Sequence, residues 1–310
     1  MSLYRPNPPP ARAGVSASCV VLPPGNWGTM AEFLSQRFPH VSAQQWTQRM
    51  QAGDVVDDQG LVLQPDCAYA VGRRLYYFRW LASEPHIPFE ASILWQDAHL
   101  LVVDKPHFLP VLPSGKYLQE TVLVRLKRAL GLEDLSPIHR IDRDTAGLVL
   151  FSVQRATRAS YHELFRNRKV DKTYEAIAPW DPALPWPMQR ATRIVESGHF
   201  MQQTEVAGEP NTLTHIDVIE VHGTLARYAL KPVTGHRHQL RVHMAGLGLP
   251  LVGDAIYPTL TAEGVCDTLR PLQLLAQSVA FTDPLSGERR QFRSRRSLRP
   301  LVELQDEICR

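Results

Sequence analysis

The most constraining feature of this chain is a series of strand-like segments in its second half. Residues 172–178 alternate apolar and polar side chains, and 212–222 and 224–233 are two more β-type runs separated by a glycine. Residues 236–247 extend the series as a strand that turns helical. Neighbouring strands with short connections pair antiparallel. The series therefore predicts an α+β fold, with a mixed, largely antiparallel central sheet and flanking helices.

Other segments divide the chain into three parts. Residues 1–25 are rich in Pro, Ala and Ser and are expected to be a flexible arm. Residues 26–82 hold two helical stretches and short strands joined by Asp/Gly turns, which predicts a small module. A linker containing prolines then leads into a larger domain over 83–310. Within that domain we expect strands at 92–106 and 146–152 and helices at 120–132 and 155–170.

Composition narrows the class of protein. Over 310 residues the net charge is +3 and the pI about 8.7, a balance that permits a nucleic-acid partner without requiring one. Arginines and lysines cluster at 155–172 and 288–300, and each cluster is either a solvated face or a phosphate-binding surface. No signal peptide and no run of ~20 apolar residues is present, so we expect a cytoplasmic protein without a membrane span.

The cysteines give no sign of a disulfide framework or of a zinc site. Cys19, Cys67, Cys266 and Cys309 are scattered, and no pair has the spacing of metal ligands. This usage favours a reducing compartment.

The stretch PIHRIDRDTAGLVLF, residues 137–151, crowds charge immediately before a buried strand. One interpretation is structural: Asp144 caps the turn, and Asp142 pairs with a neighbouring arginine. The other is chemical, because His139, Arg140 and Asp142 lie just before a turn, where a rigid scaffold often presents functional groups. Nearby arginines would keep Asp142 ionised, as a nucleophile requires.

The stretch TGHRHQLRVHMAGLGLPLVGD, residues 234–254, raises the question of a metal site. On a strand, His236 and His238 would share one face while His243 points the other way. That arrangement lacks a third ligand on the same face, so no metal site is predicted. A basic strand end that offers Arg237 or Arg241 to an anionic partner fits better.

Taken together, four stretches resemble the motifs of the RluA-type pseudouridine synthases, in the same order and over about residues 90–296. They are LLVVDKPHFLPV, HRIDRDTAGLVLF, DKTYEAIA and LKPVTGHRHQLRVHMAGLGLPLVGDAIYP. Residues 28–80 more weakly resemble the alpha-L RNA-binding module, with Arg37, Arg49, Arg73 and Arg74 available for phosphates. The chain departs from the family pattern at four positions: Ile141, Ala146, His236 (where an arginine is usual) and Leu275.

The resemblance implies a reaction and a set of residue roles. These enzymes cut the bond between ribose and N1 of uracil, rotate the base and rejoin it through C5, so no metal or cofactor is expected. Asp142 is implied as the nucleophile or base, Arg241 as its partner, and Tyr174 as the residue against the base. The residues implied in RNA binding are Arg140, His139, Lys105, Arg143, Thr145, His238 and Gln239, with Arg140 as the wedge that replaces the flipped uridine.

The resemblance thus predicts an RNA pseudouridine synthase, with 83–310 as its catalytic domain. Ribosomal RNA is the expected substrate and transfer RNA the alternative, and a monomer is expected. Two rival functions remain at this point: a non-catalytic RNA-binding protein of the same fold, and a metal-dependent hydrolase that uses the histidines of 236–243.

Overall fold

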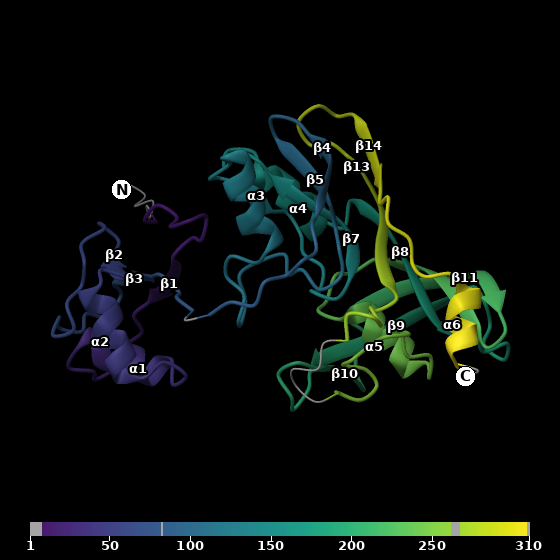
Figure 1. Ribbon diagram of the computed structural model, residues 1–310, viewed down its shortest axis with the longest axis horizontal. Helices are drawn as coiled ribbons and strands as arrows, with labels where there is room; N and C mark the ends of the chain where they lie inside the picture. Colours follow the sequence, from purple (N-terminus) through teal and green to yellow (C-terminus); the bar gives the residue numbers. More distant parts are fainter. Residues whose placement is uncertain (1–7, 82, 262–266, 309–310) are drawn as a thin grey trace. The chain divides into compact units, whose positions relative to one another are not determined.

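The computed structural model describes residues 8–81, 83–261 and 267–308. The first seven residues of the expected arm, and Cys266 and Cys309, lie outside this range. The chain divides into two compact units: Met1–Pro85 with Leu112–Glu133, and His86–Val111 with Asp134–Arg310 (Figure 1). In the part of the chain that the structure describes, no helix is both long enough and apolar enough to cross a membrane.

The first unit combines a small sheet with three helices. Its strands pair antiparallel in the order β1–β3–β2, with bounds β1 Ser18–Val21, β2 Val55–Asp57 and β3 Arg74–Tyr77. Its helices are α1 Met30–Arg37, α2 Ala43–Gln51 and α3 Val122–Leu130. Ser42 begins α2 through a capping box with Gln45, in agreement with the N-cap expected at this serine.

Two sequence expectations about this unit need correction. The arm expected over 1–25 includes a paired strand, β1, and Arg12, whose guanidinium pairs with Asp54. The helix expected in the catalytic domain, α3, belongs instead to the first unit. It is fixed there by Glu84, whose carboxylate accepts the N–H groups of residues 118–120 at 2.7–2.9 Å. A boundary at residue 82 therefore does not separate two complete bodies.

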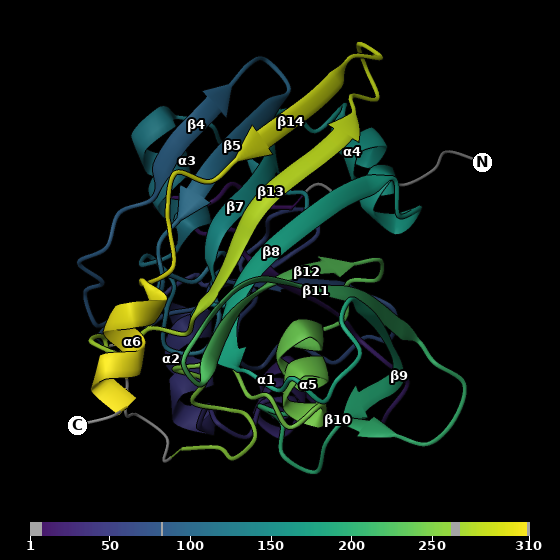
Figure 2. The same cartoon turned by 90° about the vertical axis from the view of Figure 1, so that its right-hand side faces the viewer.

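The second unit is built on one 11-stranded sheet, and this confirms the predicted fold class (Figure 2). The main path runs β10–β9–β11–β12–β8–β13–β7–β5–β4, with β14 on β13 and β6 on β7. All strand pairs are antiparallel except β13 with β7. The strands are β4 Ser92–Gln96, β5 Leu100–Lys105, β6 Ser136–Pro137, β7 Ala146–Ser152, β8 Val170–Pro179, β9 Met188–Glu196, β10 Gln203–Val206, β11 Thr212–His222, β12 Leu225–Pro232, β13 Leu274–Thr282 and β14 Arg289–Arg293.

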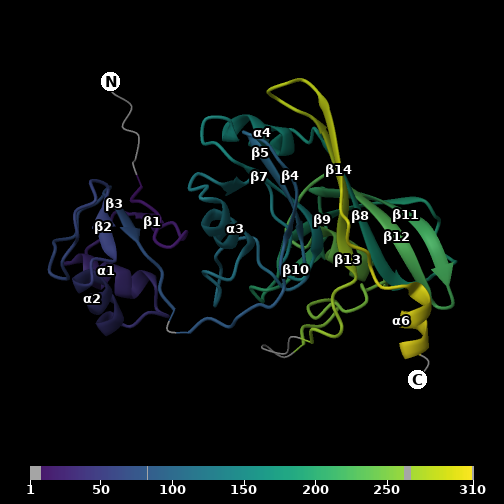
Figure 3. The ribbon, with the colours of Figure 1, turned by 45° about the horizontal axis from the view of Figure 1, so that its top comes forward.

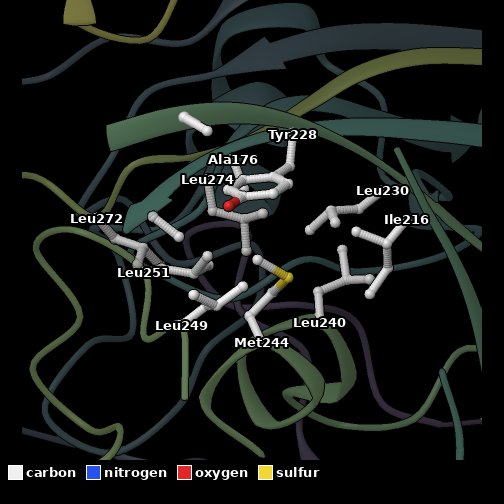
Figure 4. Packing of buried hydrophobic residues seen from close by; sticks show 12 residues of the cluster. Ala176, Ile216, Tyr228, Leu230, Leu240, Met244, Leu249, Leu251, Leu272 and Leu274 are labelled. Carbon is white, nitrogen blue, oxygen red and sulfur yellow. The ribbon is translucent and has the colours of Figure 1, made fainter. Parts of the chain in front are cut away.

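Helices α4 Arg158–Arg166, α5 Gln239–Gly246 and α6 Leu301–Ile308 complete this unit. Leu240 and Met244 of α5 point into a cluster formed with Ile216, Tyr228 and Leu230 of the sheet (Figure 4). The expected strand at the start of 236–247 is absent, because residues 239–246 are helical and His238 has φ +57°. The strand geometry assumed for the histidines is thus wrong.

Gly147 brings the charged stretch 138–145 to its place beside the sheet. Its φ is +106°, and a Cβ atom there would lie 2.3 Å from the carbonyl oxygen of Ala276. Only glycine lets β7 approach β13 this closely in their parallel pairing. The turn before β7 is thereby fixed next to the start of β13.

The arginine cluster of 288–300 is partly neutralised by acids of the protein itself. Arg290 pairs with Asp283, Arg296 with Asp104, and Arg299 with Glu307. Part of the cluster forms β14, which extends along β13 (Figure 3). The structure therefore favours a structural use of Arg290, Arg296 and Arg299 over the phosphate contacts expected as one alternative, whereas Arg293 and Arg295 are exposed.

Candidate active site

One pocket of about 440 Å³ gathers residues of three of the four motif stretches, and the stretch 100–111 is not part of its lining. Its walls come from the turn at 139–145, the end of α4 with the start of β8 at 165–174, and the segment 232–241. Asp142 is the single acid among the described residues that line it. The arginines and lysine of the lining are Arg140, Arg166, Arg168, Lys172 and Arg241. The basic side chains suit a polyanionic ligand. The single carboxylate among them is a group that can react with such a ligand.

Asp142 is held by Arg241 of α5. The Nη1 of Arg241 donates to Asp142 Oδ2 at 3.1 Å, and its Nε and Nη2 donate to the two carboxylate oxygens of Asp254 at 2.8 and 2.6 Å. The Asp254 side chain is completely buried, whereas the Asp142 side chain is 28% exposed. Asp254 Oδ1 also accepts the backbone N–H groups of Ile256 and Tyr257.

The charge of Arg241 is stabilised in spite of its burial. Burial alone would lower its pKa, but hydrogen bonding and the charge of Asp254, together with Asp142, raise the pKa above the ordinary value. A bidentate pair with a planar guanidinium fixes orientation as well as charge. Arg241 is therefore a rigid cation directed at Asp142.

Tyr174 lies on β8 and lines the same pocket. Burial, aided by the negative charge of Asp142, raises the pKa of its phenol. The side chain thus stays a neutral phenol near neutral pH. The structure brings together Asp142, Tyr174 and Arg241, the three residues that the sequence singled out for catalysis.

His238 also faces Asp142. Its Nε2 is 3.8 Å from Asp142 Oδ1, and its Nδ1 is 2.9 Å from the hydroxyl of Tyr257. Burial lowers the pKa of His238, so the neutral ring is favoured. This residue was expected to bind RNA, and its position places it beside Asp142 as well.

Two residues expected to bind RNA have other partners. Lys105 is fully buried, and its Nζ donates to the carbonyl oxygens of Pro106 and Arg143 at 2.8 Å. Burial lowers the pKa of Lys105 to about 7. Gln239 is also buried, and its amide is used by four hydrogen bonds that involve Thr234, His236, Leu213 and Thr214. Both side chains thus hold loops of the pocket through their own hydrogen bonds, which favours a positioning role for them over direct contact with RNA.

The other expected RNA contacts belong to the turn before β7. Arg140 is exposed at the pocket. His139 stacks on Phe165 and its Nε2 accepts the Leu150 N–H at 3.2 Å; burial lowers its pKa to about 3. Arg143 pairs with Asp144 at 2.8 Å. Thr145 is buried and its N–H donates to the carbonyl of Asp142, which closes the turn. Of these residues, Arg140 is best placed to meet a substrate.

The three histidines considered for a metal lie in different surroundings. His236 is exposed at the pocket, His238 faces Asp142, and His243 is buried on the far side of α5. Both ring nitrogens of His243 have threonine hydroxyl partners, at 2.9–3.0 Å. In the ranges that the structure describes, no group of His, Cys, Asp or Glu side chains has the arrangement of a metal site.

The sequence analysis does not single out Asp254 and Tyr257. Both lie in the stretch LVGDAIYP, at the end of the fourth stretch that resembles the family. The sequence does carry one signal for Asp254: an acid that follows an apolar run is expected to be buried. A buried carboxylate needs a cation, and Arg241, 13 residues earlier, supplies it.

Solved structures with this architecture define the class of protein. The structure described as Human RNA Pseudouridylate Synthase Domain Containing 4 matches 68% of this chain and 90% of its own with a TM-score of 0.52 and 27% identity. Human RNA Pseudouridylate Synthase Domain Containing 1 matches 73% of this chain and 98% of its own with a TM-score of 0.56 and 21% identity. The fold is therefore that of the pseudouridine synthases.

Sequence comparison identifies the family. The family described as RNA pseudouridylate synthase matches residues 99–246. The Uncharacterized RNA pseudouridine synthase slr1592 of Synechocystis sp. is 31% identical over 246 residues, 78% of this chain and 84% of that protein. The Dual-specificity RNA pseudouridine synthase RluA of Haemophilus influenzae is 30% identical over 228 residues, 68% of this chain and 94% of that protein. The chain belongs to the RluA family of RNA pseudouridine synthases, and it is an isomerase that acts on RNA.

Proposed function

We propose that Asp142 starts the isomerisation of a uridine that has been flipped out of its RNA into the 440 Å³ pocket. The observation that carries this proposal is the 3.1 Å contact between the Asp142 carboxylate and a guanidinium that Asp254 already fixes. A preoriented carboxylate is ready for nucleophilic or base chemistry without reorganisation. In the reaction the bond from C1′ to N1 breaks and a bond from C1′ to C5 forms, while the proton leaves C5 and N1 gains one.

Other pocket residues take the roles that substrate binding requires. Tyr174 lies against the base, where its neutral hydroxyl can exchange a proton at C5. Arg140 is exposed at the pocket and fills the space that the flipped uridine leaves in the RNA. Arg166 and Arg168, at the turn between α4 and β8, contact phosphates on that side of the pocket.

The substrate we propose is ribosomal RNA, with transfer RNA as the alternative. Support comes from the small N-terminal unit, which we propose as an RNA-binding module. The Haemophilus relative is named a dual-specificity enzyme, so the test must cover more than one class of RNA. We also propose a monomeric enzyme that works in the cytoplasm.

Pseudouridine mapping tests this proposal. RNA from cells with and without the gene is treated with a pseudouridine-specific reagent and sequenced, with ribosomal and transfer RNA analysed separately. The expected result is one or a few sites in ribosomal RNA that disappear without the gene and return with the wild-type gene but not with Asp142→Asn. Loss of sites in transfer RNA alone would establish the alternative, and unchanged maps would contradict both.

A further inference from the structure

The two groups that face the Asp142 carboxylate are both held by one short segment, residues 254–257. Asp142 Oδ2 accepts a hydrogen bond from Arg241, and Asp142 Oδ1 faces His238. Asp254, at the start of the segment, binds Arg241, and Tyr257, at its end, binds His238. Asp254 has so far served only to hold Arg241, and Tyr257 has had no role in the reaction.

On the Asp254 side, the carboxylate itself is immobilised. It is completely buried, and both of its oxygens accept hydrogen bonds from Arg241. Its Oδ1 also accepts the backbone N–H groups of Ile256 and Tyr257 at 2.8 and 3.0 Å. The guanidinium therefore has one orientation, and its remaining Nη1 is directed at Asp142.

On the Tyr257 side, the hydrogen bonds set the tautomer of His238. The Tyr257 hydroxyl accepts the backbone N–H of Gln203 at 2.7 Å, so its own proton is free to donate to His238 Nδ1 at 2.9 Å. A neutral ring that accepts at Nδ1 carries its proton at Nε2. That N–H faces Asp142 Oδ1 across 3.8 Å, too long for a hydrogen bond but close enough for a favourable charge–dipole contact.

We propose that Asp254 and Tyr257 are positioning residues for the isomerisation: Asp254 acts through Arg241, Tyr257 acts through His238, and together they fix the carboxylate of Asp142 from both sides. This inference rests on the proposed role of Asp142. His238 is thereby assigned to the orientation of the nucleophile instead of to RNA recognition. Its backbone is left-handed, with φ +57°, and its Nε2 faces Asp142.

The central test is Tyr257→Phe, which removes the hydroxyl and keeps the ring. The probe is bulk RNA labelled with [5-³H]uridine and extracted from cells that lack the gene, because tritium leaves C5 when the base is isomerised. Single-turnover rates are measured with enzyme in excess over a range of concentrations. The expected result is a maximal rate lowered ~10-fold, with the half-saturating enzyme concentration unchanged.

The matched control is Tyr228→Phe. Its hydroxyl is also internal and donates to the carbonyl of Pro179 at 2.7 Å, but it has no link to Asp142. This variant should react at the wild-type rate. Equal losses in the two variants would show that a buried hydroxyl supports the fold in general, and would overturn the proposal.

A double-mutant cycle separates action through His238 from support of the fold. If Tyr257 acts through His238, Tyr257→Phe should change the rate less than about two-fold in a His238→Ala background. If the hydroxyl matters instead because it accepts the Gln203 N–H, the same ~10-fold loss should persist in that background, and the proposal fails. A His238→Ala variant with the wild-type rate would also overturn it.

Asp254→Asn gives an independent measurement of the other branch. The amide keeps the shape and one acceptor but loses the charge, so Arg241 is held less rigidly. We expect a loss of ~10–100-fold in the maximal rate without a change in half-saturation, and a wild-type rate would remove Asp254 from the proposal. Asp142→Asn, measured in parallel, distinguishes failure of this inference from failure of the proposed function. If Asp142→Asn is inactive while Tyr257→Phe is fully active, only this inference is contradicted. If Asp142→Asn is active, the proposed function is contradicted.

Discussion

Arg241 and Asp142 are 99 residues apart in the sequence, and Arg241 Nη1 lies 3.1 Å from Asp142 Oδ2. Arg241 binds two carboxylates unequally. It donates one hydrogen bond to the partly exposed Asp142 and two to the completely buried side chain of Asp254. Removing the charge of Asp142 therefore leaves Arg241 neutralised, whereas removing Arg241 leaves a buried carboxylate without its cation.

The first prediction follows for Asp142→Asn. The variant should fold normally, bind RNA with wild-type affinity, and lose at least ~10³-fold in the rate of tritium release, because the reacting carboxylate is gone. The matched control is Asp144→Asn, an acid of the same stretch that pairs with Arg143 instead. Activity within a few-fold of wild type for Asp142→Asn would contradict the mechanism.

The second prediction concerns the stability of the Arg241–Asp254 pair. Arg241→Met should lower the free energy of unfolding by ~3–5 kcal/mol, because Asp254 is then buried without a counter-charge. The double variant Arg241→Met/Asp254→Asn should recover much of that loss but no activity. Urea unfolding of the three proteins measures this. A double variant as unstable as Arg241→Met alone would show that the loss comes from packing.

The third prediction is a pH dependence of stability caused by His243. Burial lowers its pKa to about 4 from 6.5. Between these values the unfolded chain binds a proton that the folded protein does not, so stability is complete above pH 6.5 and falls as the pH decreases toward 4. Through His243 alone, the free energy of unfolding should fall by roughly 2 kcal/mol between pH 6.5 and 5.

Urea unfolding of wild type and His243→Gln at pH 7, 6 and 5 tests this. The variant does not titrate at this position, so the stability difference between wild type and variant should shrink as the pH falls. His222→Gln, at an exposed position of β11, is the control and should follow the wild-type profile. Parallel profiles for wild type and His243→Gln would show that His243 does not cause the pH dependence.

Asp142, Tyr174 and Arg241, the residues proposed for catalysis, could be chosen from the sequence because they lie in short stretches that resemble the family motifs. Tyr174 needed that resemblance, since a strand tyrosine by itself is more often a packing residue. The sheet could be predicted because its central strands have strong β-type patterns. Helix α5 was harder to identify, since residues 239–244 are all buried and show no apolar stripe on one side. The role of Lys105 was hidden as well, because an unpaired lysine is rarely buried and nothing local shows that it is.

Long-range pairing explains the rest of what the sequence did not predict. Helix α3 has an ordinary amphipathic pattern that is compatible with either unit, and its place is decided by Glu84 and by core contacts of Val124 with Val15. Strand β9 is polar at most exposed positions, so its pattern resembles that of a loop. Such features depend on contacts with residues far away in the sequence, and these contacts cannot be predicted from the local helix or strand propensity of a segment.

The fourth prediction is that activity survives removal of metal ions. The reaction is redox-neutral, and the residues proposed for it use a carboxylate, a guanidinium and a phenol. Rates measured in EDTA, with the RNA folded in monovalent salt, should equal those in magnesium within about two-fold. Activity that is lost in EDTA on an unstructured RNA and restored by zinc would favour the hydrolase considered from the sequence.

The last prediction tests the N-terminal unit as an RNA-binding module. Deleting residues 1–82 is unsuitable, because the deletion would remove the partners of α3 and of the segment that Glu84 holds. Charge substitutions avoid this problem. Arg73 is already paired with Asp57 at 2.9 Å, so the suitable set is Arg37, Arg49 and Arg74.

The triple change of these three arginines to Gln should weaken RNA binding and reduce the slope of log affinity against log salt by up to about 3 × 0.7, since each phosphate contact releases counterions. The single-turnover rate at saturating enzyme should stay at the wild-type value, because the pocket lies entirely in the second unit. Arg299→Gln is the matched control, since Glu307 already neutralises that charge. An unchanged affinity and salt slope for the triple variant would show that RNA capture does not depend on these arginines, and would direct the search to the α4–β8 turn.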